Sequence, residues 1–235
     1  MQIVRYSLWL VLWGLAIVLL LYPINCLIIR VSLVLVLLAA SVSTLWVFWN
    51  RKTFRHAFIV VLLLGGGFLV CPGHTANPQT ICDAYVQALR SYEGTRYLWG
   101  GENQYGIDCS GLVRAGLIKA NFQAGVFTFN PRLVRFSLSL WWHDCSAREL
   151  GAEYRGQTRH ILSAPSINTL DESRIQPGDL AVTASGVHVL AFLGAQKWIE
   201  ADPHYQRVVI VPVPDPKNPW FKEPVLITRW TELAQ

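Results

Sequence analysis

The sequence predicts an α+β domain that follows an N-terminal segment of about three membrane-spanning helices. The chain has 235 residues, of which 52% are hydrophobic and only 15% charged, whereas a soluble domain carries about 25% charged residues. The first 76 residues hold five of the twenty Lys and Arg residues and none of the fifteen acidic residues. Beyond residue 77, a helical spacing of apolar residues gives way to short runs typical of strands.

The positive charge of the chain belongs to its apolar first third. The remaining fifteen basic and fifteen acidic residues cancel, so the net charge of +5 comes entirely from residues 1–76. A charge imbalance confined to that segment does not indicate a nucleic-acid partner. Residues 77–235 also lack a basic stripe with interleaved aromatic residues, and we therefore expect no nucleic-acid binding.

Three apolar runs without an internal charge predict the spans, near residues 8–22, 31–49 and 57–71. A hydrocarbon core about 30 Å thick needs roughly 20 helical residues. The second run has 19 residues, and the first and third have 15 each. These shorter runs reach further if flanking basic side chains extend to the interface. Residues 1–76 are thus expected to be the membrane segment, and residues 77–235 a separate domain.

The cations predict the orientation. Arg51, Lys52 and Arg55 lie between the second and third runs, and such basic connections stay cytoplasmic. Three spans then place the N-terminus inside and the following domain outside the cytoplasmic (inner) membrane. Arg30 falls on the outer side, against this rule. The alternative is that the first run is a cleaved signal peptide, but no A-x-A-like site follows Tyr22.

In residues 77–235, the sequence predicts helices first and strands afterwards. Apolar residues at helical spacing begin at Ile81 and end before Gly94. After a glycine-rich loop, a second helix is expected over 109–120, and a third around 146–154; the rest of 121–176 gives no clear pattern. Strands are expected at 179–183, 187–193, 198–201 and 207–211, with 225–230 as a candidate fifth. This order favours an antiparallel sheet with helices on one side.

Cys109 begins the predicted second helix, directly after the glycine-rich loop. The partial positive charge and free N–H groups of a helix N-terminus stabilise a thiolate and can hold an oxyanion. A cysteine nucleophile needs a base, and His188 on a predicted strand is the candidate. The base needs a partner for its other ring nitrogen. Glu200, on the next predicted strand, would lie beside it in a hairpin, with Asp202 and His204 as nearby rivals.

Five motifs occur in a fixed order along this part of the chain. They are Tyr-Leu-Trp-Gly-Gly (97–101), Gly-Ile-Asp-Cys-Ser-Gly-Leu-Val (106–113), Pro-Gly-Asp-Leu (177–180), Gly-Val-His-Val (186–189) and Trp-Ile-Glu-Ala (198–201). Together they closely resemble the NlpC-type family of papain-like cysteine peptidases, which act on bacterial cell walls. The resemblance runs from about residue 80 to 230, with gaps. It implies a papain-like fold for the soluble domain.

The resemblance also implies roles for individual residues. Cys109 matches the nucleophile, and His188 matches the base. Tyr97 matches a tyrosine near the oxyanion. Asp108 and Ser110, which flank the nucleophile, match residues that shape the substrate subsite.

Two features depart from the family pattern. The third catalytic position falls on Glu200, where the family usually has His, Asn or Gln, but a carboxylate can equally accept the ring N–H of the base. Residues 121–176 are longer than the family's usual link between helix and sheet. This insertion is expected to reshape the cleft or to act as a lid.

The implied reaction is acyl transfer to Cys109 followed by hydrolysis, without a cofactor or a metal. The implied substrate is a peptidoglycan stem peptide, often at the bond between the γ-carboxyl of D-glutamate and a diamino acid. The same Cys–His pair serves cell-wall amidases and acyltransferases, and a third residue of the Glu type is reminiscent of CHAP-type amidases. A catalytically silent, membrane-bound binding module is the remaining alternative.

The remaining candidate groups of residues do not indicate a specific site. His143, Asp144 and Cys145 are adjacent and lack the spacing of metal ligands, so no metal site is expected. Cys82 and Cys145 could form a disulfide, which a sequence does not determine. The lipid bilayer is an expected partner, and a membrane-protein partner stays open.

Overall fold

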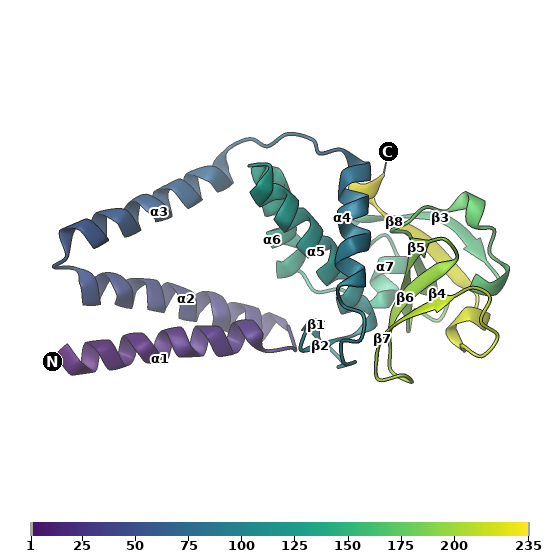
Figure 1. The fold of residues 1–235 in the computed structure, drawn as a ribbon, viewed down its shortest axis with the longest axis horizontal. Helices are drawn as coiled ribbons and strands as arrows, with labels where there is room; N and C mark the ends of the chain where they lie inside the picture. Colours follow the sequence, from purple (N-terminus) through teal and green to yellow (C-terminus); the bar gives the residue numbers. More distant parts are fainter. Residues whose placement is uncertain (1, 235) are drawn as a thin grey trace.

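The N-terminal third of the chain forms three long helices that project from a compact α+β domain (Figure 1). The structure, a computed structural model, describes residues 2–234. The helices are α1 (Gln2–Leu21), α2 (Leu27–Phe48) and α3 (Lys52–Val70). Each is long and apolar enough to cross a membrane. α1 and α2 lie side by side and antiparallel, whereas α3 diverges from them (Figure 1). The predicted runs lengthen into these helices by taking up their flanking residues.

A threonine hydroxyl joins α1 to α2. The indole N–H groups of Trp9 and Trp13 both donate to Oγ1 of Thr44, at 2.9 and 3.1 Å. The Thr44 hydroxyl in turn donates to the carbonyl of Ala40 at 2.7 Å. Small and polar side chains of this kind hold apolar helices together where hydrophobic burial gives no advantage.

Arg30 does not lie in the connection between the first two helices, where the sequence placed it. That connection is shorter than expected, because α2 already begins at Leu27 and takes Arg30 into its first turn. The Arg30 side chain is fully buried, with Nη2 3.0 Å from Oε2 of Glu102 in the soluble domain. Its charge is therefore neutralised within the protein, which removes the conflict with the charge rule for loops.

The soluble domain contains the predicted helices and strands with several additions. Its helices are α4 (Pro78–Arg90), α5 (Cys109–Phe127), α6 (Pro131–Trp142) and α7 (Ala147–Gly151), and its strands are β1 (Glu102–Asn103), β2 (Gly106–Ile107), β3 (Thr158–Ala164), β4 (Leu180–Thr183), β5 (Val189–Gly194), β6 (Lys197–Asp202), β7 (Arg207–Pro212) and β8 (Val225–Trp230). The six larger strands form one antiparallel sheet in the order β3-β8-β4-β5-β6-β7. The predicted α+β class, with helices on an antiparallel sheet, is confirmed.

The sequence analysis missed α6, β3 and the short β1–β2 pair, and it did not give the place of β8 in the sheet. α5 continues to Phe127, and α6 follows after Asn130 caps it and Pro131 starts it. β3 went unrecognised because it is a sheet edge with a bulge near His160, which breaks the alternation. β8 lies between β3 and β4, a position that only long-range pairing decides.

The sheet is buried on both faces. α4 and α5 cover one face, where Tyr85, Leu89 and Leu112 meet Val189 and Ile199. On the other face, a second core includes Leu190, Phe192, Trp198, Phe221 and Ile227. Because both faces are covered, the side chains of His188, just before β5, and of Glu200 and Asp202 on β6 lie in the protein interior and need partners there.

Candidate active site

Asp108 sets the start of α5 and thereby the position of Cys109, the first residue of that helix. Its Oδ1 accepts hydrogen bonds from the backbone N–H of Gly111 at 2.6 Å and from the Ser110 hydroxyl at 3.0 Å. Its Oδ2 accepts from the N–H of Gly100 at 2.8 Å. The carboxylate thus ties the glycine-rich loop to the first turn of the helix.

The glycine of the Asp-Cys-Ser-Gly motif has a steric reason. A Cβ at Gly111 would overlap the carbonyl oxygen of Gly101. The backbone N–H of Asp108 donates to that same oxygen at 3.0 Å. The first turn of α5 therefore packs directly against the loop, and this close packing fixes the position of Cys109.

Cys109, His188 and Glu200 form a line of hydrogen-bonding groups. Cys109 lies close enough to His188 to raise the pKa of its imidazole, and His188 Nε2 lies 2.7 Å from Oε2 of Glu200. His188 directly precedes β5, and Glu200 lies on β6. All three are buried, with 6%, 2% and 0% of their surface exposed.

The surroundings of His188 favour its protonated form. Burial lowers the pKa of His188, but hydrogen bonds to Cys109 and Glu200 outweigh it and raise the pKa to about 9. A carboxylate on one side and a thiol on the other thus retain a proton on the ring at neutral pH. This arrangement suits a thiolate–imidazolium pair.

Two residues that the sequence did not single out complete this line. Asn218 is buried, and its Nδ2 donates to Oε1 of Glu200 at 2.6 Å. The Trp220 ring stacks on His188, with centroids 4.3 Å apart. Both lie in the irregular segment between β7 and β8, where no periodic pattern marks buried positions. In the sequence, a polar Asn within a Pro-rich stretch was the only indication that this segment contributes to the site.

Hydrogen-bond partners distinguish Glu200 from Asp202 and His204, the other two candidates for the partner of His188. Asp202 is buried, but its Oδ1 accepts from the backbone N–H groups of His204 and Tyr205 in the turn after β6. Asp202 therefore shapes that turn, and His204 belongs to it. Glu200 is the acidic residue that contacts His188.

An open cleft of about 550 Å³ lies beside Cys109. One wall comes from the loop and helix start, including Trp99, Asp108 and Ser110. The insertion supplies another wall, which includes Asp144, Cys145, Ser146, Ala147 and Glu149. The long segment 121–176 therefore borders the cleft through its residues 144–149, while its α6 packs against α5.

Tyr97 lies half-buried close to Cys109. Burial, and the nearby charges of Cys109 and Asp108, raise the pKa of Tyr97 to about 12. The phenol accordingly stays protonated at neutral pH and can donate a hydrogen bond.

A largely buried charge network connects the cleft wall to helix α2. Arg114 on α5 pairs with Glu102, and its Nη1 lies 3.4 Å from Oδ1 of Asp144. Arg30 on α2 pairs with the same two acids, at 3.0 and 3.8 Å. The Arg30 Nη1 also donates to the carbonyl of Trp142 at 3.2 Å. Two arginines and two acids therefore hold α2, the loop and the insertion together.

The other cysteines show no comparable environment. Cys82 and Cys145 are buried and free, and they form no disulfide with each other. Burial raises the pKa of the Cys82 thiol to about 11, and it raises the pKa of Cys145 as well. Within residues 2–234, no group of three or more His, Cys, Asp or Glu side chains is arranged to hold a metal ion.

Residues 94–229, more than half of the chain, match the model of the NlpC/P60 family. The chain belongs to the NlpC/P60 family. The family resemblance predicted from the motifs is thereby confirmed. Cys109, His188 and Glu200 all lie within the matched NlpC/P60 region. No curated protein matches the chain.

Several solved NlpC/P60 structures are similar to this chain. An NlpC/P60 family protein from Bacillus cereus is 19% identical over 67% of this chain and 41% of its own, with a TM-score of 0.42. The P60 domain of an antigen from M. avium subspecies paratuberculosis is 22% identical over 65% and 96%, with a TM-score of 0.39. The peptidoglycan hydrolase RipB from Mycobacterium tuberculosis is 20% identical over 72% and 77%, with a TM-score of 0.42. This chain thus spans less than half of the Bacillus cereus protein.

Proposed function

We propose that this protein is a membrane-anchored cysteine peptidase that hydrolyses peptide bonds in peptidoglycan stem peptides. The observation that carries the proposal is the buried line from Cys109 through His188 to Glu200 at a helix N-terminus beside an open cleft. Membership of the NlpC/P60 family supports the substrate class, since a peptidoglycan hydrolase is among the similar structures. The proposed bond joins the γ-carboxyl of D-glutamate to a diamino acid.

In the proposed mechanism, the Cys109 thiolate attacks the peptide carbonyl carbon. The carbonyl oxygen becomes an oxyanion, which the free N–H groups of the first turn of α5 and the Tyr97 hydroxyl stabilise. His188 gives its proton to the leaving amine as the C–N bond breaks. A water molecule then gives a proton to His188, and its hydroxide attacks the thioester, which releases the acid and restores the thiolate–imidazolium pair.

Glu200 acts in this scheme through His188. Its Oε2 accepts the Nε2–H of the ring and so directs the other ring nitrogen toward Cys109. Asn218 fixes Glu200 in turn through Oε1. Asp108 and Ser110 line the cleft and are the proposed substrate contacts nearest to the nucleophile.

We further propose that the three N-terminal helices cross the cytoplasmic membrane, with the N-terminus inside and the catalytic domain outside. The C-terminal ends of α1 and α3 and the start of α2 lie nearest to the domain, and the α2–α3 turn lies at the far end (Figure 1). Arg51 lies in that turn, and Lys52 and Arg55 lie in the first turn of α3, as expected for the cytoplasmic end of two spans.

The test is a digest of purified peptidoglycan by the full-length protein in detergent, analysed by mass spectrometry. Wild type should release fragments cut within the stem peptide, and Cys109→Ala should release none. Cys71→Ala, at the exposed cysteine after α3, is the matched control and should behave like wild type. Full activity in Cys109→Ala would refute the proposal. A freed lactyl group on the amino sugar would instead identify an amidase.

A further inference from the structure

A second cavity, of about 270 Å³, lies where the membrane helices meet the soluble domain. It shares no lining residue with the catalytic cleft. Leu19 and Leu20, from the last turn of α1, and Ile29 and Leu33, from the start of α2, form part of its wall. One wall of this cavity thus comes from the ends of α1 and α2 that lie nearest to the domain, and we propose that these helices span the bilayer.

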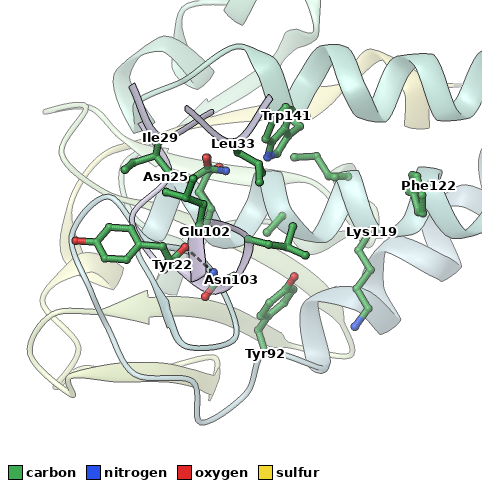
Figure 2. Close-up of a pocket in the computed structure, with 14 residues that line it drawn as sticks. Tyr22, Asn25, Ile29, Leu33, Tyr92, Glu102, Asn103, Lys119, Phe122 and Trp141 are labelled. Carbon is green, nitrogen blue, oxygen red and sulfur yellow. Dashed lines mark hydrogen bonds between the residues drawn. The ribbon is translucent and has the colours of Figure 1, made fainter. Parts of the chain in front are cut away.

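The domain supplies the other walls from α5 and α6. Ala115, Ile118 and Phe122 recur at helical spacing along one side of α5, and Trp141 comes from α6. Figure 2 shows Trp141 on one side of the cavity, with Tyr92 and Lys119 on the opposite side. The lining is mainly apolar, as in sites that hold hydrocarbon.

Lys119 marks a polar end of the cavity. It also borders an adjoining pocket of about 280 Å³, which Ser91, Asn103, Gln104 and Tyr105 line with polar groups. The Lys119 ammonium donates to Oγ of Ser91 at 2.8 Å and lies 5.5 Å from the centre of the Tyr92 ring. Among residues 2–234, no carboxylate lies within 4.0 Å of it. The ammonium is therefore available to an anion.

We propose that this cavity binds one anionic phospholipid from the surrounding leaflet. A hydrocarbon chain occupies the apolar part between α1, α2 and α5, and the phosphate lies at Lys119 in the polar part. Three observations favour a lipid over a peptide. The cavity is continuous with lipid-facing positions such as Leu20, which is 65% exposed. Its lining is mainly apolar, and its cation lies near the proposed interface, where basic side chains meet lipid phosphates.

The proposed lipid lies next to the charge network of Arg30, Glu102 and Arg114. Glu102 lines the cavity and is also the acid shared by Arg30 and Arg114. A bound lipid would therefore lie beside the region where α2 contacts the loop that precedes Cys109. The inference rests on the proposed position of the bilayer, but it does not depend on the proposed reaction.

The test uses full-length protein in nanodiscs of phosphatidylcholine that contain phosphatidylglycerol with a photoactivatable diazirine on one acyl chain. Cross-linked peptides are then mapped by mass spectrometry. Adducts are expected on residues 115–122 of α5 and also on α3, whose exposed surface reports ordinary bilayer contact. Adducts on none of α1, α2 and α3 would refute the bilayer position itself. Adducts on α3 without any on α5 would refute the lipid site alone.

Filling the cavity should remove the α5 adducts selectively. Ile118→Trp fills it from the domain side, and Leu20→Trp fills it from an exposed position that tolerates a large side chain. Both should lose most α5 adducts and keep those on α3. Ile59→Trp on α3 is the matched control and should keep both. Unchanged α5 labelling in a folded Leu20→Trp protein would overturn the proposal.

The headgroup is tested separately through Lys119. Lys119→Gln should reduce α5 adducts from the phosphatidylglycerol probe by about fivefold, the factor expected for one lysine at an anionic lipid. The same change should leave adducts from a phosphatidylcholine probe unaltered. An equal loss with both probes, or no loss with either, would refute the phosphate position at Lys119.

Discussion

Glu200→Gln should impair this protein although the two side chains have the same shape. In the structure, Oε2 of Glu200 accepts from His188 and Oε1 accepts from the amide of Asn218. A glutamine offers one acceptor oxygen and one NH₂ donor. In either orientation of the amide, the NH₂ group faces a hydrogen-bond donor, either the ring N–H of His188 or the Asn218 amide.

The expected size of the effect follows from these contacts. The carboxylate–imidazole hydrogen bond is charged and fully buried, and such bonds contribute about 1.5–3 kcal/mol. If it holds the imidazole for catalysis, its loss lowers kcat/KM by about 10- to 150-fold. The unsatisfied buried pair should also cost about 1–3 kcal/mol of folding free energy. With its negative neighbour removed, the pKa of His188 should fall.

A second substitution tests whether the mismatch of hydrogen-bond donors causes the loss. Asn218→Asp in the Glu200→Gln background turns the neighbour into an acceptor, so the glutamine NH₂ can donate to it while its oxygen accepts from His188. We expect the double variant to recover much of the lost stability and activity. The measurements are peptidoglycan digestion rates and thermal unfolding, with Glu153→Gln at an exposed site as control. Full activity in the single variant, or no recovery in the double variant, would contradict the argument.

Three further predictions concern other parts of the molecule. The raised pKa of His188, about 9 against an ordinary 6.5, means that its stabilising contribution is fully present below pH 6.5 and disappears as the pH rises through 9. At about 1.36 kcal/mol per pH unit this amounts to roughly 3 kcal/mol, so thermal unfolding should shift to lower temperature over that range; a flat profile would count against it. Iodoacetamide should alkylate Cys109 faster than Cys82, whose pKa burial raises to about 11; equal rates, measured by peptide mass spectrometry, would show that Cys109 is not activated. Arg30→Met should destabilise the full-length protein by about 1.5–3 kcal/mol, because Glu102 loses one of its two arginine partners and keeps Arg114; an unchanged melting temperature would show that the Arg30 contacts contribute nothing.

Much of the fold follows from local sequence patterns. The apolar runs predicted the three long N-terminal helices, and the alternation after Pro177 predicted five of the six strands of the main sheet. The glycine-rich loop followed by apolar helical spacing placed Cys109 at a helix start, and Asp108 caps that helix in the structure, since capping involves residues that are neighbours in the chain. The hairpin from β5 to β6 likewise brought His188 near Glu200, because the loop between the strands is short.

The tertiary structure decided what distant segments contribute. Glu200 and Asp202 are two residues apart on one strand; the structure shows that Glu200 contacts His188, whereas Asp202 accepts hydrogen bonds from the backbone of the following turn. Asn218 reaches Glu200 from a segment without any periodic pattern. Arg30 reads from sequence as an outer cation, yet it is buried against Glu102, 72 residues away. Local propensity and periodicity extend over a few residues, whereas these partners are chosen by packing of the whole chain.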